Sequence, residues 1–125
     1  MKLSIITASY NCKVTISDCI NSLYNQCFTE YEHIIFDGQS SDGTLDVLNT
    51  ILNSNSILIS ENDHGVYDAL NKGLSVASGD VIGFLHSDDV YYDNNILSKV
   101  ANAFSDPAVQ AVYGDLVYAD KYDVT

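Results

Sequence analysis

The sequence contains no arginine, and its basic residues are few. Five lysines stand against 17 acidic residues, which gives the 125-residue chain a formal net charge of −12 at pH 7. With so few cations the chain cannot neutralise a run of nucleic-acid phosphates or hold an anionic membrane surface. A ligand that carries phosphate therefore needs another source of positive charge, and a bound metal ion is one.

Long hydrophobic runs are also missing. No stretch approaches the ~20 apolar residues that a membrane span requires. The apolar run near Met1 ends after a few residues, unlike that of a signal peptide. The three cysteines, Cys12, Cys19 and Cys27, match no metal-binding or redox spacing, and we expect reduced thiols. These features together predict a cytoplasmic protein.

What the sequence does contain is an alternation of short apolar runs and amphipathic stretches. Apolar runs predict strands, and apolar residues at helical spacing predict helices. The expected strands cover residues 3–8, 31–36, 57–60, 81–85 and 110–113, and the expected helices cover residues 14–27, 45–52, 66–77 and 96–104. Such alternation predicts an α/β fold, a mostly parallel sheet with helices on both faces.

We expect one domain spanning residues 1–125, because this length suits a single core. The stretch 114–121 is typical of a strand that leaves the domain, and no terminating element follows it. We therefore expect the domain to be truncated at its C-terminus.

Polar side chains follow four of the predicted strands. They are Ser9-Tyr10-Asn11, Asp37, Asp63-His64 and Ser87-Asp88-Asp89. In folds of this kind ligands bind beyond the carboxyl ends of the strands. The sequence therefore predicts that these polar clusters meet at one edge of the sheet and form a binding site.

The adjacent acids Asp88 and Asp89 are the sharpest feature of that edge. Two ionised carboxylates ~4 Å apart repel by roughly 4 kcal/mol when partly shielded from water. A hard divalent cation, Mg²⁺ or Mn²⁺, would remove that cost. The alternative is a solvated turn that caps the helix after it, since aspartate is a favoured N-cap residue.

Other polar residues at this edge also allow two interpretations. Asp37 can accept a hydrogen bond from a ribose hydroxyl or a base N–H, or it can form a turn with the glycine after it. Thr7, Ser9 and Tyr10 can contact a base or ribose, with Tyr10 stacking, or they can belong to a solvated loop. Lys72 can face a diphosphate or form an exposed ion pair four residues from an aspartate.

Four segments in order along the chain carry a resemblance to a known family. They are residues 3–11 (LSIITASYN), 34–44 (IIFDGQSSDGT), 65–73 (GVYDALNKG) and 83–89 (GFLHSDD). Together they resemble family 2 glycosyltransferases of the GT-A fold, a Rossmann-like type of nucleotide-diphospho-sugar transferase. The resemblance implies metal-dependent, inverting transfer of a sugar, with UDP-sugar the expected donor, to an acceptor hydroxyl.

The resemblance also implies roles for single residues. Asp89 would be the metal ligand for Mn²⁺ or Mg²⁺, and Asp88 would hold the ribose or diphosphate side of the donor, beside Lys72. The nucleoside would lie against the remaining predicted site residues, which are Thr7, Ser9, Tyr10 and Asp37.

The implied partners are a nucleotide-diphosphate sugar and a saccharide or glycolipid acceptor in surface polysaccharide or glycolipid biosynthesis. Association with the inner face of a membrane would come only through a missing C-terminal part or the acceptor. The general base is expected beyond residue 125, with Asp115 and Asp120 as weaker candidates. A non-catalytic nucleotide-sugar-binding module and a nucleotidyltransferase are the alternatives.

The sequence departs from the family pattern at two positions within these segments. Gly38 stands where many members have a second acid, which leaves open which group meets the base. Leu70 stands where many have an arginine, so diphosphate neutralisation would depend on Lys72 or on the metal alone.

Overall fold

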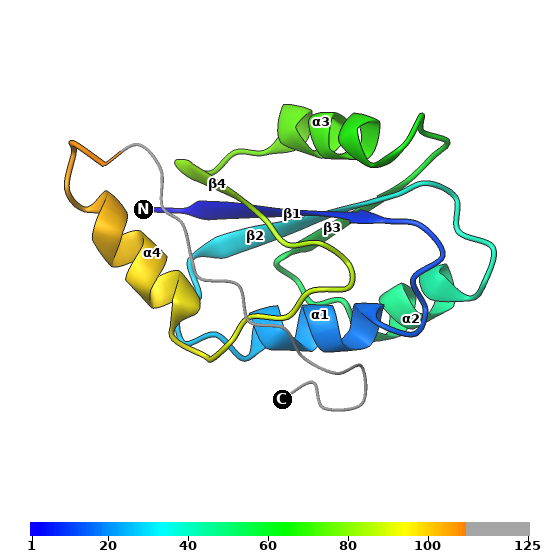
Figure 1. Ribbon diagram of the computed structural model, residues 1–125, viewed down its shortest axis with the longest axis horizontal. Helices are drawn as coiled ribbons and strands as arrows, with labels where there is room; N and C mark the ends of the chain where they lie inside the picture. The colour runs from blue at the N-terminus through cyan, green and yellow to red at the C-terminus, as the bar shows by residue number, and fades with distance from the viewer. Residues whose placement is uncertain (110–125) are drawn as a thin grey trace.

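The computed structural model describes residues 1–109, which contain a sheet of four parallel strands (Figure 1). The strands are β1 (Leu3–Ser9), β2 (Tyr31–Asp37), β3 (Ser56–Ser60) and β4 (Val81–Phe84). Their spatial order is β3-β2-β1-β4, so the chain builds outward from β1 on one side and then returns to its other side. The carboxyl ends of β1 and β4 therefore flank the point at which the strand order reverses, where open α/β sheets bind ligands.

Helices cover both faces of this sheet, as the alternation predicts. They are α1 (Ile16–Tyr24), α2 (Thr44–Ile51), α3 (Val66–Val76) and α4 (Ile96–Phe104). Figure 1 shows α3 over one face and α1 with α2 over the other. Within residues 1–109 no helix has the length and apolar character needed to cross a membrane. The predicted strand at 110–113, the stretch 114–121, and Asp115 and Asp120 lie outside the described residues.

The first helix is shorter than the predicted range of 14–27, because the residues after Tyr24 bond to a distant segment. The side-chain amide of Gln26 donates to the carbonyl of Asp93 and accepts from the N–H of Leu97 at 3.0 Å. The N–H of Cys27 donates to the carbonyl of Asn94 at 2.8 Å. These bonds fasten the end of α1 to the chain that leads into α4.

The two central strands are buried because helices pack on both of their faces. All seven residues of β2 are buried. On one face Ile35 packs against Ile16, Ile20 and Leu48, from α1 and α2. On the other face Gly73 of α3 lies so close to β1 that a methyl group there would be 2.7 Å from Cγ2 of Ile6. The absence of a side chain at Gly73 therefore sets how closely α3 approaches the sheet.

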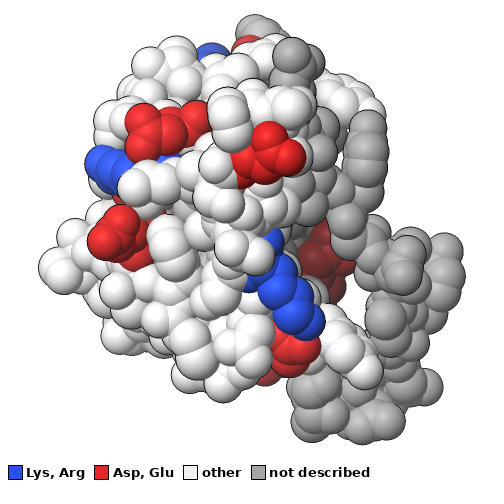
Figure 2. Space-filling view, turned by 90° about the vertical axis from the view of Figure 1, so that its left-hand side faces the viewer, with Lys and Arg blue, Asp and Glu red and all other residues white. Residues whose placement is uncertain are grey.

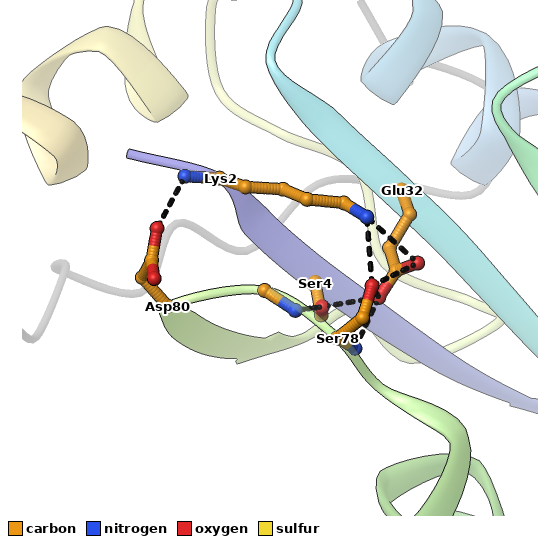
Figure 3. A network of polar contacts seen from close by, with 6 residues as sticks. Lys2, Ser4, Glu32, Ser78 and Asp80 are labelled. Carbon is orange, nitrogen blue, oxygen red and sulfur yellow. Dashed lines mark hydrogen bonds and ion pairs between the residues drawn. The ribbon is translucent and has the colours of Figure 1, made fainter.

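A carboxylate fastens the amino ends of the strands (Figure 3). Glu32 of β2 accepts hydrogen bonds from the hydroxyl of Ser4 on β1 and from the N–H of Ser78 before β4, both at 2.6 Å. Lys2 adds an ion pair to the same carboxylate at 3.3 Å. Burial raises the pKa of Glu32, but the hydrogen bonds from Ser4, Ser78 and Lys2 outweigh it and lower the pKa to about 2.

The same end of the molecule shows how the chain uses its few cations. In the view toward the amino ends of the strands, lysine side chains lie next to acidic side chains (Figure 2). Besides the Lys2 pair, Lys99 lies 3.8 Å from a carboxylate oxygen of Asp93. These lysines offset neighbouring acids rather than form a basic surface.

A histidine is fully buried in the centre of the sheet. Nε2 of His33 lies 2.8 Å from the hydroxyl of Thr7, and both side chains have no exposed surface. Nδ1 of His33 has no hydrogen-bond partner among residues 1–109. Burial lowers the pKa of His33 to about 3, so the ring stays neutral at physiological pH.

We expect this histidine to make the protein less stable in mild acid. In the unfolded chain His33 takes up a proton near its ordinary pKa of 6.5, whereas in the folded protein it does so only near 3. Its contribution is therefore complete above pH 6.5 and is lost as the pH falls toward 3, with a slope of up to ~1.4 kcal/mol per pH unit. Urea unfolding followed by circular dichroism measures this slope.

The variant His33→Leu should flatten the slope between pH 6.5 and 4.5, the ordinary pKa values of histidine and glutamate. Glu32→Gln is the matched control, because the lowered pKa of Glu32 affects stability only as the pH falls below 4.5. An unchanged slope in His33→Leu would show that His33 is not held neutral by burial.

Candidate functional site

A cavity opens at the carboxyl edge of the sheet, where the sequence predicts the polar clusters to meet. Its volume is about 650 Å³. The lining residues come from the loops after all four strands and from the start of α3: Ala8, Ser9, Tyr10, Gly38, Gln39, Asn62, Asp63, Gly65, Val66, Ala69 and Ser87. The structure therefore brings these loops together as expected.

A second cavity of about 410 Å³ lies beside the first. It shares Ala8, Val66 and Ser87 with the first cavity and extends to Asp88 and to the loop that begins α1. These shared residues make the two cavities neighbours, and we call the two adjoining cavities together the groove. Tyr10, whose side chain is 64% exposed, lies in the first cavity, and Asp88 lies in the second.

The carboxylate of Asp37 is buried beneath this groove and accepts four hydrogen bonds. Oδ1 accepts from the hydroxyls of Ser9 at 2.9 Å and Ser40 at 2.6 Å. Oδ2 accepts from the N–H of Ser40 at 2.8 Å and from the hydroxyl of Ser60 at 3.2 Å. In the structure Asp37 holds the ends of β1, β2 and β3 together, and its side chain has no exposed surface for a ligand.

Three predicted site residues, Thr7, Asp37 and Lys72, have polar groups that bond to other groups of the protein. Thr7 is bonded to His33 below the groove, and Asp37 to the surrounding serines. Ser9 reaches the first cavity, although its hydroxyl bonds Asp37.

Lys72 is the third of these residues. Its ammonium group lies 3.2 Å from a carboxylate oxygen of Asp68, 3.2 Å from the carbonyl of Asn62 and 3.8 Å from a carboxylate oxygen of Glu61. It also lies over the ring of Phe36, 5.3 Å from the centroid. Lys72 lines neither cavity, so the structure shows the ion pair that sequence reasoning gave as the alternative.

Asp88 and Asp89 are exposed in the turn after β4, where the N–H of Asp89 donates to the carbonyl of His86 at 3.0 Å. Neither caps the following helix, because α4 begins at Ile96 and its N-cap is Asn95. The structure therefore shows the solvated turn of the alternative interpretation, but this turn does not cap the helix. Neither carboxylate forms an ion pair or accepts a hydrogen bond within the described part of the chain.

This pair fits a hard divalent cation as a partial ligand set. Residues 1–109 contain no group of three or more histidine, cysteine, aspartate or glutamate side chains that could hold a metal by themselves. Magnesium and similar ions commonly take one or two carboxylates and complete their shell with waters and substrate phosphates. Two unpaired carboxylates beside an open groove match that chemistry.

Sequence reasoning missed a thiol that supports this turn. The sulfur of Cys19 in α1 donates a hydrogen bond to the carbonyl of His86 at 3.3 Å. Burial above all, together with the neighbouring charges of Cys12, Asp89 and Asp88, raises the pKa of Cys19 to about 12. The thiol therefore stays protonated and can keep donating; its helical spacing indicated only that it faces the core.

Comparison with known proteins places the chain in a family. The glycosyl transferase family 2 model matches residues 4–124. The chain belongs to glycosyl transferase family 2. The family 2 chain is 39% identical, over 99 residues, to the UDP-Glc:alpha-D-GlcNAc-diphosphoundecaprenol beta-1,3-glucosyltransferase WfaP of Escherichia coli, covering 78% of this chain and 39% of WfaP. It spans less than half the length of the curated relatives it matches.

Solved structures with the same architecture confirm the GT-A fold. The family 2 chain is similar to S. aureus TarS 1-349 in complex with UDP-GlcNAc, with a TM-score of 0.78, 30% identity, and coverage of 84% of this chain and 31% of TarS. It also shares its fold with the mannosyltransferase PcManGT from Pyrobaculum calidifontis in complex with GDP-Man and Mn²⁺. That likeness has a TM-score of 0.79 at 23% identity, and covers 86% of this chain and 33% of the other.

The bonds of Asp37 predict a structural role that can be measured. Asp37→Asn replaces one acceptor oxygen with an amide group that faces donors, so we expect the free energy of unfolding to fall by roughly 2–3 kcal/mol. Ser60→Ala removes only the 3.2 Å bond and should cost about 1 kcal/mol or less. Urea unfolding measures both. A stable Asp37→Asn variant that had lost only nucleotide binding would show that Asp37 acts on a ligand.

Proposed function

We propose that this chain is the donor-binding part of a metal-dependent, inverting glycosyltransferase that uses a nucleotide-diphosphate sugar, with UDP the expected nucleotide. The observation that carries the proposal is the pair of adjoining cavities, one lined by Tyr10 and the other by Asp88. Tyr10 exposes its aromatic ring in the first cavity, and Asp88, which precedes Asp89 in the sequence, lines the second cavity with an unpaired carboxylate. A nucleotide needs both features, because its base stacks and its diphosphate needs a counter-charge.

The residues of the groove divide the work between them. Tyr10 offers its ring to the base, and Ser9 with Gly38 forms the floor of that cavity. Asp88 and Asp89 would hold Mn²⁺ or Mg²⁺, which supplies positive charge to the departing diphosphate. Thr7, Asp37 and Lys72 support the loops from below, since their polar groups bond within the protein. Asp88 also bounds the space in which the ribose and diphosphate would lie.

The acceptor and the general base complete the proposal. The acceptor would be a saccharide or glycolipid hydroxyl in surface polysaccharide or glycolipid biosynthesis, as the lipid-diphosphate substrate in the name of WfaP supports. We assign no residue within 1–109 as the general base. Transfer would occur on the cytoplasmic side of a membrane, where such an acceptor is displayed.

The test is the melting temperature of the chain with UDP, with Mn²⁺, and with both. A ligand at ~100 times its dissociation constant adds roughly 2.7 kcal/mol, which is several degrees for a domain of this size. We expect this shift only when UDP and Mn²⁺ are present together, because the diphosphate and the acidic pair need the ion to bring them together. Asp89→Ala should abolish it.

Asp46→Ala is the matched control, because Asp46 is an exposed acid on α2 that lines neither cavity. It removes the same charge and should leave the shift unchanged. A cooperative melt that neither ligand moves, or a shift that survives Asp89→Ala, would contradict the proposal.

A further inference from the structure

Gly38 and Asp63 lie against each other in the wall of the first cavity. A methyl group on Gly38 would lie 2.7 Å from Oδ2 of Asp63, closer than real carbon and oxygen atoms approach. The backbone of Gly38 is not in the left-handed region that favours glycine, where Gly43 and Gly65 lie. Gly38 therefore serves to leave room, and the group that takes this room is the carboxylate of Asp63.

One oxygen of that carboxylate is fixed and the other is free. Oδ1 of Asp63 accepts a hydrogen bond from the N–H of Gly65 at 3.0 Å, which orients the half-buried side chain. Oδ2 accepts no hydrogen bond from any of residues 1–109. An oriented carboxylate oxygen without a donor, in the wall of a cavity, is a ready acceptor for a ligand N–H or O–H.

The sheet order shows which part of a nucleotide would meet this oxygen. Asp63 follows β3, whereas Asp88 follows β4, and these are the two outer strands in the order β3-β2-β1-β4. Three strand spacings of about 4.8 Å separate them, roughly 14 Å in all. With the diphosphate at Asp88, an extended nucleotide directs its base, its most distant part, toward Asp63.

We propose, building on the function above, that Oδ2 of Asp63 accepts a hydrogen bond from a ring N–H of the donor's base and so selects that base. Tyr10 lies in the same cavity and supplies the stacking face, which is tolerant of any base. Stacking alone gives no selectivity, whereas a carboxylate requires a donor opposite it. Asp63 is thus a specificity-determining residue rather than a catalytic one.

The chemistry of the four bases gives the expected preference. Uracil presents a ring N–H at N3 and guanine presents one at N1, so both offer the donor that Asp63 requires. Cytosine and adenine carry a lone pair on the corresponding ring nitrogen, which faces the carboxylate unfavourably. A site that hydrogen-bonds a ligand N–H rejects analogues without it, because the buried group then stays unpaired.

The test is calorimetric binding of UDP, GDP, CDP and ADP to the chain in the presence of Mn²⁺. We expect the unsubstituted protein to bind UDP at least about tenfold more tightly than CDP and ADP. The GDP arm shows whether the cavity also admits the larger base with the same N–H. Asp63→Asn should lower the affinity for UDP by about tenfold. It should leave the affinity for CDP unchanged or raise it, because the amide can turn its NH₂ group toward N3 of cytosine.

Two further variants separate recognition from loop structure. Glu61→Gln removes the same charge two residues away, from a carboxylate that among residues 1–109 contacts only Lys72, at 3.8 Å, and lines neither cavity, so the UDP-to-CDP ratio should not change. Gly38→Ala keeps every charge but forces Asp63 aside, and it should lower that ratio as Asp63→Asn does.

Equal weakening of all four nucleotides by Asp63→Asn would overturn the proposal, because it would mean that Asp63 only orders its loop. If UDP binds through Asp89 and the UDP-to-CDP ratio survives Asp63→Asn, the assignment of Asp63 fails while the proposed function stands. If the unsubstituted protein binds none of the four, the proposed function has failed and the assignment with it.

Discussion

Four hydrogen bonds to the carboxylate of Asp37 hold together the ends of three neighbouring strands. Parallel strands end at the same edge of a sheet, and hydrogen bonds such as these set the direction in which the following loops leave that edge. Ser40, held by Asp37, also accepts from the N–H of Asn11, and Asn11 accepts in turn from the N–H of Ser41. The loops after β1 and β2 are thus bonded to each other, and both loops contribute residues to the wall of the first cavity.

This arrangement explains why Thr7 and Asp37, which are predicted to touch a ligand, have polar groups that bond within the protein. A serine or aspartate at a strand end carries the same sequence signal whether it points into a cavity or ties two loops together. The difference depends on partners such as Ser60 and His33, which are far from Asp37 and Thr7 in the sequence. A sheet edge with many polar groups needs internal partners for them, because unpaired buried polar groups are costly.

The order, type and parallel pairing of the elements could be predicted from periodicity, since strands buried on both faces form continuous apolar runs such as residues 34–36. The end of α1 could not be predicted in this way, because Gln26 and Cys27 bond to residues about 70 positions away in the sequence. At the site, the convergence of polar clusters was predictable from strand ends. The contact between Gly38 and Asp63 was not, because neither residue forms a motif with the other in sequence.

The pairing of lysines with acids bears on how a nucleotide would reach the groove. Lys2, Lys72 and Lys99 each lie against a carboxylate, while the whole chain carries a net charge of −12. The surrounding field therefore opposes a free nucleoside diphosphate and attracts a divalent cation. Encounter would favour a nucleotide that arrives already complexed with its ion, and added salt would hasten the approach of the free nucleotide by screening the repulsion.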